Sequence, residues 1–195
     1  MKSTQPHNPQ NKVSSPYRHS HTKLTKLVLY AMLGSVTYAG KVAMESIPNV
    51  HPVALLLMAF TVVYRVEALI PLYVYVFLVG LFNGFGLWWY PYLYIWTILW
   101  GVTMLLPKHM KPKVAAVVYP LVCALFGLAF GTLYAPAQAL LFHYDLATTL
   151  KWILVGLPYD FIHCMGNLCM GLLVYPLVQL LRKLNRMIGL RLNTK

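Results

Sequence analysis

The residues best suited to chemistry lie in one block near the C-terminal end, GLPYDFIHCMGN, residues 156–167. Asp160, His163 and Asn167 are spaced i, i+3, i+7, so a helix would carry all three on one face. Such a face could bond to neighbouring helices or contact a bound small molecule. A metal or acid–base site has less support, because His163 and Cys164 point to different sides of the helix and no metalloprotease or phosphate-loop motif is present. We therefore expect no catalytic residue, metal or cofactor.

A second block, NGFGLWWYPYLYIW at residues 83–96, is rich in large aromatic rings. Trp and Tyr collect where membrane helices meet water. Trp88 and Trp89 are adjacent, however, so both cannot face lipid, and the following rings surround the helix end. We expect some rings to hold this helix end at the interface. The others, with Trp89, Tyr92 and Trp96 as the inward set, are expected to line a binding site.

The composition is that of a membrane protein. Apolar residues make up 59% of the 195-residue chain and charged residues only 10%, against about 25% charged in soluble domains. The apolar runs are long and do not alternate, which favours membrane helices over a β-barrel. The net charge of +12 is explained by basic cytoplasmic segments, so we expect no nucleic-acid binding. The three cysteines fit no zinc spacing and are expected to be small core residues.

We predict an all-α integral membrane protein with six transmembrane helices. The polar residues 1–22 are expected to form a disordered basic cytoplasmic tail, 23–185 the membrane domain, and 186–195 a second basic tail. The second helix is short for a hydrocarbon core of about 30 Å. The six predicted spans are about 24–46, 51–65, 67–83, 90–106, 114–142 and 158–183.

The distribution of charge predicts the orientation. With the N-terminus inside, all of the 16 Lys and Arg residues except Lys41 and Lys151 fall in segments on the cytoplasmic side. Three of the four acids fall toward the outside. This asymmetry favours cytoplasmic N- and C-termini in a multi-pass protein of the bacterial plasma membrane.

Polar and aromatic residues gather at the predicted outer end, which the connections 45–52, 83–91 and 143–157 would form. Ionisable groups near a membrane interior usually face a cavity or a partner, so we expect a substrate site there. Glu45 has an alternative, an i, i+4 pair with Lys41, which we prefer. The candidate substrate-binding residues are Glu45, Asn49, Asn83, Trp89, Tyr92, Trp96, His143, Trp152, Tyr159, Asp160, His163 and Asn167.

Two rows of small residues at spacing four could let helices approach closely. We expect at least one row to serve packing within the bundle, which leaves the first-helix row free for a partner. The row on the first helix is Ala31, Ser35, Ala39 and Ala43. The row on the fifth is Cys123, Gly127, Gly131 and Ala135.

Three blocks carry a resemblance to a known family. They are IPNVHPVALLLMAFTVVYR (47–65), GFGLWWYPYLYIW (84–96) and GLPYDFIHCMGN (156–167). Together with the six-span pattern and the small-residue row on the first helix, the chain resembles the substrate-binding S components of energy-coupling factor (ECF) transporters, in an uncharacterised subgroup. The resemblance covers roughly residues 24–183.

The resemblance implies a function and partners. Such an S component binds a vitamin or related micronutrient from outside and docks through its first helix on a transmembrane coupling subunit, which two cytoplasmic ATPases drive. It hydrolyses nothing itself. Carried onto this chain, Ala39 and Ala43 would make the docking contact, with Ala31 and Ser35 extending it. The serine in the row and the charged pair beside it leave the extent of that contact open.

The substrate class stays open at this stage. Aromatic faces suit a planar ring, and the acids Glu45, Asp145 and Asp160 favour a cationic or donor-rich compound, such as a thiamine-like molecule or a modified base. Lys41 and Lys151 keep a folate-like polyanion possible. The alternative function is a small intramembrane enzyme or a membrane scaffold that uses the polar face of residues 156–167.

Overall fold

The computed structural model describes residues 16–190, and their side chains from residue 23 onward. The predicted tails therefore lie partly outside the described residues, at 1–15 and 191–195. Within the described part the chain is helical and contains no strand. The elements are α1 (Pro16–Ala43), α2 (Val53–Tyr64), η1 (Arg65–Ala68), α3 (Leu69–Asn83), η2 (Leu87–Trp89), α4 (Tyr92–Met104), α5 (Pro112–Phe142), α6 (Leu146–Gly171) and α7 (Val174–Met187).

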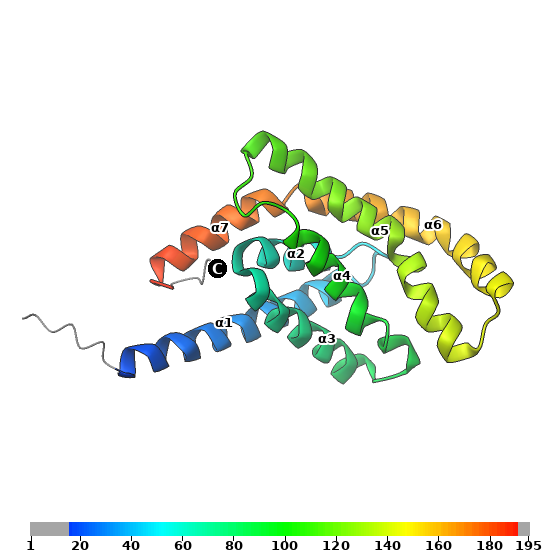
Figure 1. The fold of residues 1–195 in the computed structure, drawn as a ribbon, viewed down its shortest axis with the longest axis horizontal. Coiled ribbons are helices and arrows are strands. Elements are labelled where there is room, and N and C mark those ends of the chain that lie inside the picture. The colour runs from blue at the N-terminus through cyan, green and yellow to red at the C-terminus, as the bar shows by residue number, and fades with distance from the viewer. Residues whose placement is uncertain (1–15, 191–195) are drawn as a thin grey trace, which may run out of the picture.

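Three helical stretches of the described chain are long and apolar enough to cross a membrane: Val53–Asn83, Pro112–Phe142 and Leu146–Gly171. The all-α prediction is confirmed for the described residues, and the three stretches indicate a membrane protein. Figure 1 shows the chain turning between α2 and α3, so Val53–Asn83 is two helical segments and not one straight helix. The number of crossings and the orientation of the termini stay predictions.

Helix α2 lies at the centre of the bundle (Figure 1). All of its residues except Leu56 are buried, and it contacts α1, α3, α4, α5, α6 and α7. Twelve residues span about 18 Å, which is less than the hydrocarbon core. Surrounding helices therefore cover α2, and this explains why its sequence is apolar on every side.

Helices α5 and α6 form a closely packed antiparallel pair, which runs across the top and right of Figure 1. Their approach depends on glycine. A Cβ atom added to Gly127 would lie 2.8 Å from the His163 carbonyl oxygen, and one added to Gly171 would lie 2.5 Å from Pro120 Cα. All four members of the small-residue row on α5 are buried. This row therefore serves internal packing.

The structure corrects the predicted connection at 143–157. Residues from Leu146 onward are helical, because Asp145 caps α6 by accepting a hydrogen bond from the Thr148 amide at 2.8 Å. The predicted span 158–183 is also two helices, with a break at residues 172–173. Pro176 favours the break, since its ring has no N–H and would collide with the Leu172 carbonyl of a regular helix.

The structure also defines the start of α1 and the continuity of α5. Helix α1 begins at Pro16, so it includes residues 16–22, which the sequence had assigned to the polar tail. Helix α5 continues through Pro120 and Pro136 without interruption. Figure 1 shows it changing direction toward its C-terminal end, as an internal proline causes.

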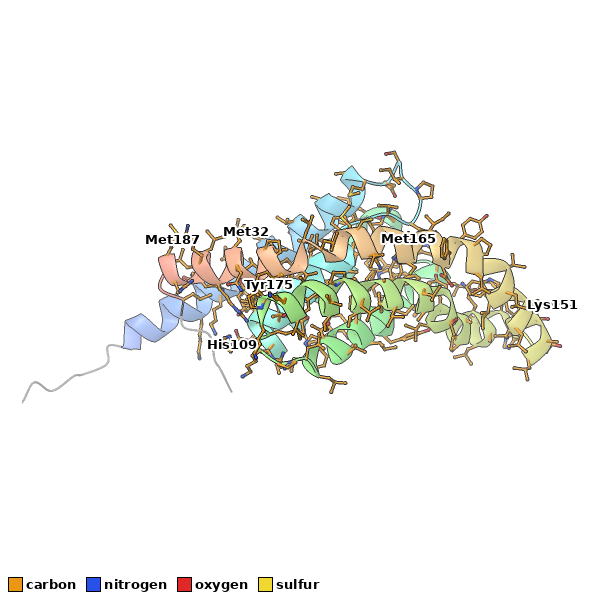
Figure 2. All side chains as sticks on the ribbon, turned by 90° about the horizontal axis from the view of Figure 1, so that it is seen from above. Met32, His109, Lys151, Met165, Tyr175 and Met187 are labelled. Atoms are coloured by element: carbon orange, nitrogen blue, oxygen red, sulfur yellow. The ribbon has the colours of Figure 1, made fainter. Side chains whose placement is uncertain are left out.

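The basic residues Lys26, Arg65 and Arg182, which come from three of the segments predicted to be cytoplasmic, have contacts on the same side of the described structure. Lys26 of α1 pairs with Glu67 of η1 at 2.8 Å, Arg65 donates to the Leu106 carbonyl at 3.3 Å, and Arg182 of α7 donates to the Lys108 carbonyl. Figure 2 shows Met187 toward this side and Lys151 at the opposite end of the molecule. We call the side of the molecule that holds Arg65, Arg182 and Met187 the basic end.

Candidate functional site

The polar face predicted for residues 156–167 is present on α6. Asp160, His163 and Asn167 are 6%, 3% and 1% exposed, although most of the surrounding helix is open. The side chains of Asp160 and Asn167 face the glycines of α5, and the backbone of His163 contacts Gly127. Gly131 donates its backbone N–H to Asp160 Oδ1 at 3.0 Å, and a Cβ on Gly127 would lie 2.9 Å from Asn167 Nδ2. Glycine on α5 therefore makes the space that these polar groups occupy.

A histidine from a distant part of the chain joins this face. His51 lies in the connection between α1 and α2, and its ring centroid is 5.1 Å from that of His163 and 6.3 Å from that of Trp96. The ring of Phe130 on α5 also packs against His163 in an edge-to-face contact, with centroids 4.9 Å apart. The connection thus brings a second imidazole onto the polar face of α6.

Aromatic rings form the wall of the site. Trp96 of α4 is 1% exposed and contacts Tyr75, Tyr92 and Phe130 at centroid distances of 5.8, 6.1 and 5.7 Å. Aromatic pairs of this geometry are mutually attractive. We call the following six residues the buried cluster: His51, Trp96, Phe130, Asp160, His163 and Asn167.

The buried cluster contains six polar atoms that have no hydrogen-bond partner within the described protein. A buried group without a partner costs about 1–3 kcal/mol, so this concentration in one place calls for a functional reason. The indole is a donor, the carboxylate oxygen an acceptor, the amide both, and each imidazole either one. The atoms are His51 Nδ1, Trp96 Nε1, Asp160 Oδ2, His163 Nε2, and Asn167 Oδ1 and Nδ2.

The inward aromatic set is only partly in this cluster. Trp96 belongs to it, and the Tyr92 ring packs against Trp96 and Phe130. Trp89 does not: its indole donates to the Val76 carbonyl at 2.8 Å, and its ring packs on Phe85. Trp89 instead attaches the 83–91 connection to α3 through this hydrogen bond.

Several other predicted site residues lie outside the buried cluster. Glu45 is 57% exposed and pairs with Lys41 at 3.1 Å, as preferred from the sequence. Asn49 donates to the backbone carbonyl of Tyr159 at 3.3 Å, while the Tyr159 ring is exposed. Asn83 is exposed at the end of α3, where Tyr38 donates to it at 3.4 Å.

The remaining predicted residues lie on the far part of the α5–α6 pair. His143 ends α5 in the left-handed conformation, with φ of 55°, and is exposed. Trp152 stacks on Tyr134 with a centroid distance of 6.1 Å. The hydrogen bonds from Thr148 lower the pKa of Asp145, because they stabilise its carboxylate form. Asp145 therefore acts as a helix cap and not as part of the buried cluster.

Two members of the cluster, His51 and Phe130, were not among the candidate substrate-binding residues, although His51 belongs to the polar residues at the predicted outer end. His51 carried a usable signal, since it is an ionisable residue at the edge of an apolar run. Phe130 carried none, because one phenylalanine in an apolar helix looks like any core residue. Their positions depend on how α5, α6 and the α1–α2 connection pack together.

The described residues hold no group of three or more potential metal-binding side chains. The surface also has two apolar grooves, one on α3 around Tyr73 and one on α6 around Met165. Neither is lined by a residue of the buried cluster.

No protein-family model, no curated protein and no solved structure matches the chain. Function is therefore inferred from the buried cluster and from the surface of α1.

Proposed function

We propose that this chain is the substrate-capturing membrane subunit of an ECF-type ABC transporter. It would bind a vitamin or related small organic micronutrient from outside a bacterial plasma membrane, with six spans and both termini in the cytoplasm. A transmembrane coupling subunit and two cytoplasmic ATPases would then drive uptake. The observation that carries the proposal is the buried cluster with its unpartnered polar atoms.

The cluster is suited to bind a small organic molecule. Its side chains come from α4, α5, α6 and the α1–α2 connection, so they converge from separate parts of the bundle. Small-molecule sites typically combine apolar and aromatic walls with a few polar groups that fix orientation. A planar ligand with donors and acceptors along one edge would satisfy the amide, imidazole and indole atoms together.

The surface of α1 supports docking on a partner helix. Ala31, Ser35, Ala39 and Ala43 are all exposed, unlike the small-residue row on α5. The Ser35 hydroxyl donates to the Ala31 carbonyl at 2.9 Å, so the row presents no unbonded polar group. The opposite side of α1 is already in use, because Gly34 packs against Val74 of α3.

The contacts of the acidic side chains support a narrower proposal for the substrate class. Of the three acids first considered, Glu45 pairs with Lys41 and Asp145 caps α6, which leaves Asp160 in the cluster. No Lys or Arg belongs to the cluster, so a folate-like polyanion is disfavoured. A planar compound rich in N–H donors fits best, with Asp160 Oδ2 as its strongest acceptor.

Native mass spectrometry of the purified protein tests substrate capture. We expect a co-purified molecule of vitamin size that Asn167→Leu and His163→Leu lose, while circular dichroism stays helical. Turnover of a small molecule by the isolated chain, abolished by His163→Ala, would instead support the alternative intramembrane enzyme. Purified protein that never binds a planar micronutrient would refute the proposal.

Complex formation tests the docking surface separately. Ala39→Trp and Ala43→Trp should preserve ligand binding but abolish assembly with the coupling subunit and uptake. Ala116→Trp is the matched control, because Ala116 is also exposed on a helix but lies on α5. Normal uptake by both α1 variants would show that this row is not the docking surface.

A further inference from the structure

Two arginines hold the same chain segment at the basic end. Arg65 donates to the Met104 carbonyl at 2.6 Å and to the Leu106 carbonyl at 3.3 Å. Arg182 of α7 donates to the Lys108 carbonyl two residues farther along. The segment 104–108 is therefore bracketed by two positive charges.

Arg65 is held in a backbone conformation that side chains rarely adopt. Its φ is 55° and its ψ is −120°. Residues with a side chain pay a steric cost in this region, and surrounding contacts have to maintain it. Here the Thr61 carbonyl binds the Arg65 amide, and the Trp100 indole binds the Arg65 carbonyl at 3.1 Å. The guanidinium is thus fixed in position before anything binds to it.

Neither arginine has an acidic partner among the described residues. The chain has four acidic side chains: Glu67 binds Lys26, Glu45 binds Lys41, and the other two lie on the α5–α6 pair. Arg182 uses only one terminal nitrogen in its bond to the protein, although a guanidinium carries five N–H donors. The pair can therefore still bind an anion.

Apolar side chains flank these charges on α4 and α5. Leu105 is 85% exposed, and Val102 before it is also exposed. On α5, Val114, Val117 and Leu121 are exposed along one side of the helix. A fixed pair of cations beside exposed apolar helices matches the shape of an amphiphile with a charged head and apolar chains.

We propose that an anionic phospholipid binds at the basic end, with its phosphate between Arg65 and Arg182 and its acyl chains along α4 and α5. An arginine fork matches phosphate oxygens in geometry as well as in charge. The apolar flank favours a lipid over an acidic segment of a soluble partner, which would not need it. This site is separate from the buried cluster and does not depend on the transport function.

The test is native mass spectrometry and thermal unfolding of the full chain in detergent with dioleoyl phosphatidylglycerol or dioleoyl phosphatidylcholine. Phosphatidylglycerol should bind more tightly and raise the Tm. Arg182→Gln should weaken its binding about 5-fold or more, whereas Lys183→Gln, an equal charge change at the next, exposed position, should change it less than about 2-fold. Arg65→Gln could disturb the fold through its carbonyl bonds, so Arg182→Gln is the deciding variant.

Four results would overturn the proposal. Equal losses in Arg182→Gln and Lys183→Gln would show attraction by overall charge alone. Equal binding of phosphatidylcholine, or displacement of phosphatidylglycerol by millimolar inorganic phosphate, would rule out recognition of an anionic lipid. Unchanged lipid binding in Arg182→Gln with loss of assembly on the ATPase subunits would assign the arginines to a protein partner.

Discussion

The imidazole rings of His51 and His163 meet edge to face with their centroids 5.1 Å apart. One comes from the connection before α2 and the other from the middle of α6. Both have a ring nitrogen without a hydrogen-bond partner in the described protein, and the ring of Phe130 packs against His163. The fold therefore places two polar rings in apolar surroundings at some energetic cost, as binding sites commonly do.

The first prediction separates a binding role of the cluster from a structural one. Both side-chain polar atoms of Asn167 are buried and unpartnered, so Asn167→Leu should leave the free energy of unfolding of the ligand-free protein unchanged or raise it by about 1 kcal/mol. Ligand binding should fall sharply. Scanning fluorimetry in detergent measures the first effect, and native mass spectrometry the second.

Asn185 is the control for this substitution. It is also buried, but its Oδ1 accepts a hydrogen bond from Tyr64 at 3.2 Å. Asn185→Leu leaves the Tyr64 hydroxyl without its partner and should cost about 1–2 kcal/mol while ligand binding is retained. If Asn167→Leu proves the more destabilising and ligand binding persists, the polar face of α6 is a structural seam.

The second prediction concerns the contact between α5 and α6. In Gly127→Ala the new Cβ would lie 2.8 Å from the His163 carbonyl oxygen, and because that atom is backbone it cannot move aside. We expect the free energy of unfolding to fall by about 1–3 kcal/mol, as measured by thermal or chemical unfolding. Gly156→Ala on α6 is the control, since nothing lies within 4 Å of its Cβ; it should raise stability by about 0.5–1 kcal/mol. Equal effects of the two substitutions on stability would mean that α5 and α6 pack less closely than in this structure.

The third prediction compares the two ion pairs. Lys26–Glu67 joins α1 to η1 and is partly buried, and Glu67 also accepts a hydrogen bond from the Tyr30 hydroxyl. Lys41–Glu45 is instead an exposed pair with i, i+4 spacing on the surface. Glu67→Gln should therefore cost about 1–3 kcal/mol and Glu45→Gln no more than about 0.5 kcal/mol. Unfolding at low and high salt checks this, because only the exposed pair should be strongly screened. A larger cost for Glu45→Gln than for Glu67→Gln would contradict the view that Lys26–Glu67 is the more stabilising pair.

Local patterns in the sequence predicted which side chains share a helix face better than they predicted where the helices begin and end. The i, i+3, i+7 spacing placed Asp160, His163 and Asn167 on one buried face, because helix periodicity is a local property. The start of α6 was missed, since Gly156 and Pro158 resemble a break, although Asp145 and Thr148 form a recognisable helix cap. The break before α7 has its own local signal in Pro176.

Tertiary packing decided what the sequence left open. The two small-residue rows look alike in the sequence, yet α5 buries its row against α6 while α1 exposes its row. Trp89 and Trp96 were equally suited to the inward set, and only the position of α3 shows that Trp89 is bound to the Val76 carbonyl. Neighbouring helices determine such outcomes, and no single segment contains that information.

The fourth prediction is the orientation in the membrane. His109 directly follows the segment 104–108 at the basic end, and Lys151 lies at the opposite end of the molecule (Figure 2). The positive-inside rule places the basic end in the cytoplasm. With the three native cysteines replaced, Lys151→Cys should react with a membrane-impermeant maleimide in intact cells. His109→Cys, which is also exposed, should react only after permeabilisation. The opposite labelling pattern would show that the protein has the reverse orientation in the membrane. The buried cluster could then no longer be proposed as a site that captures substrate from outside.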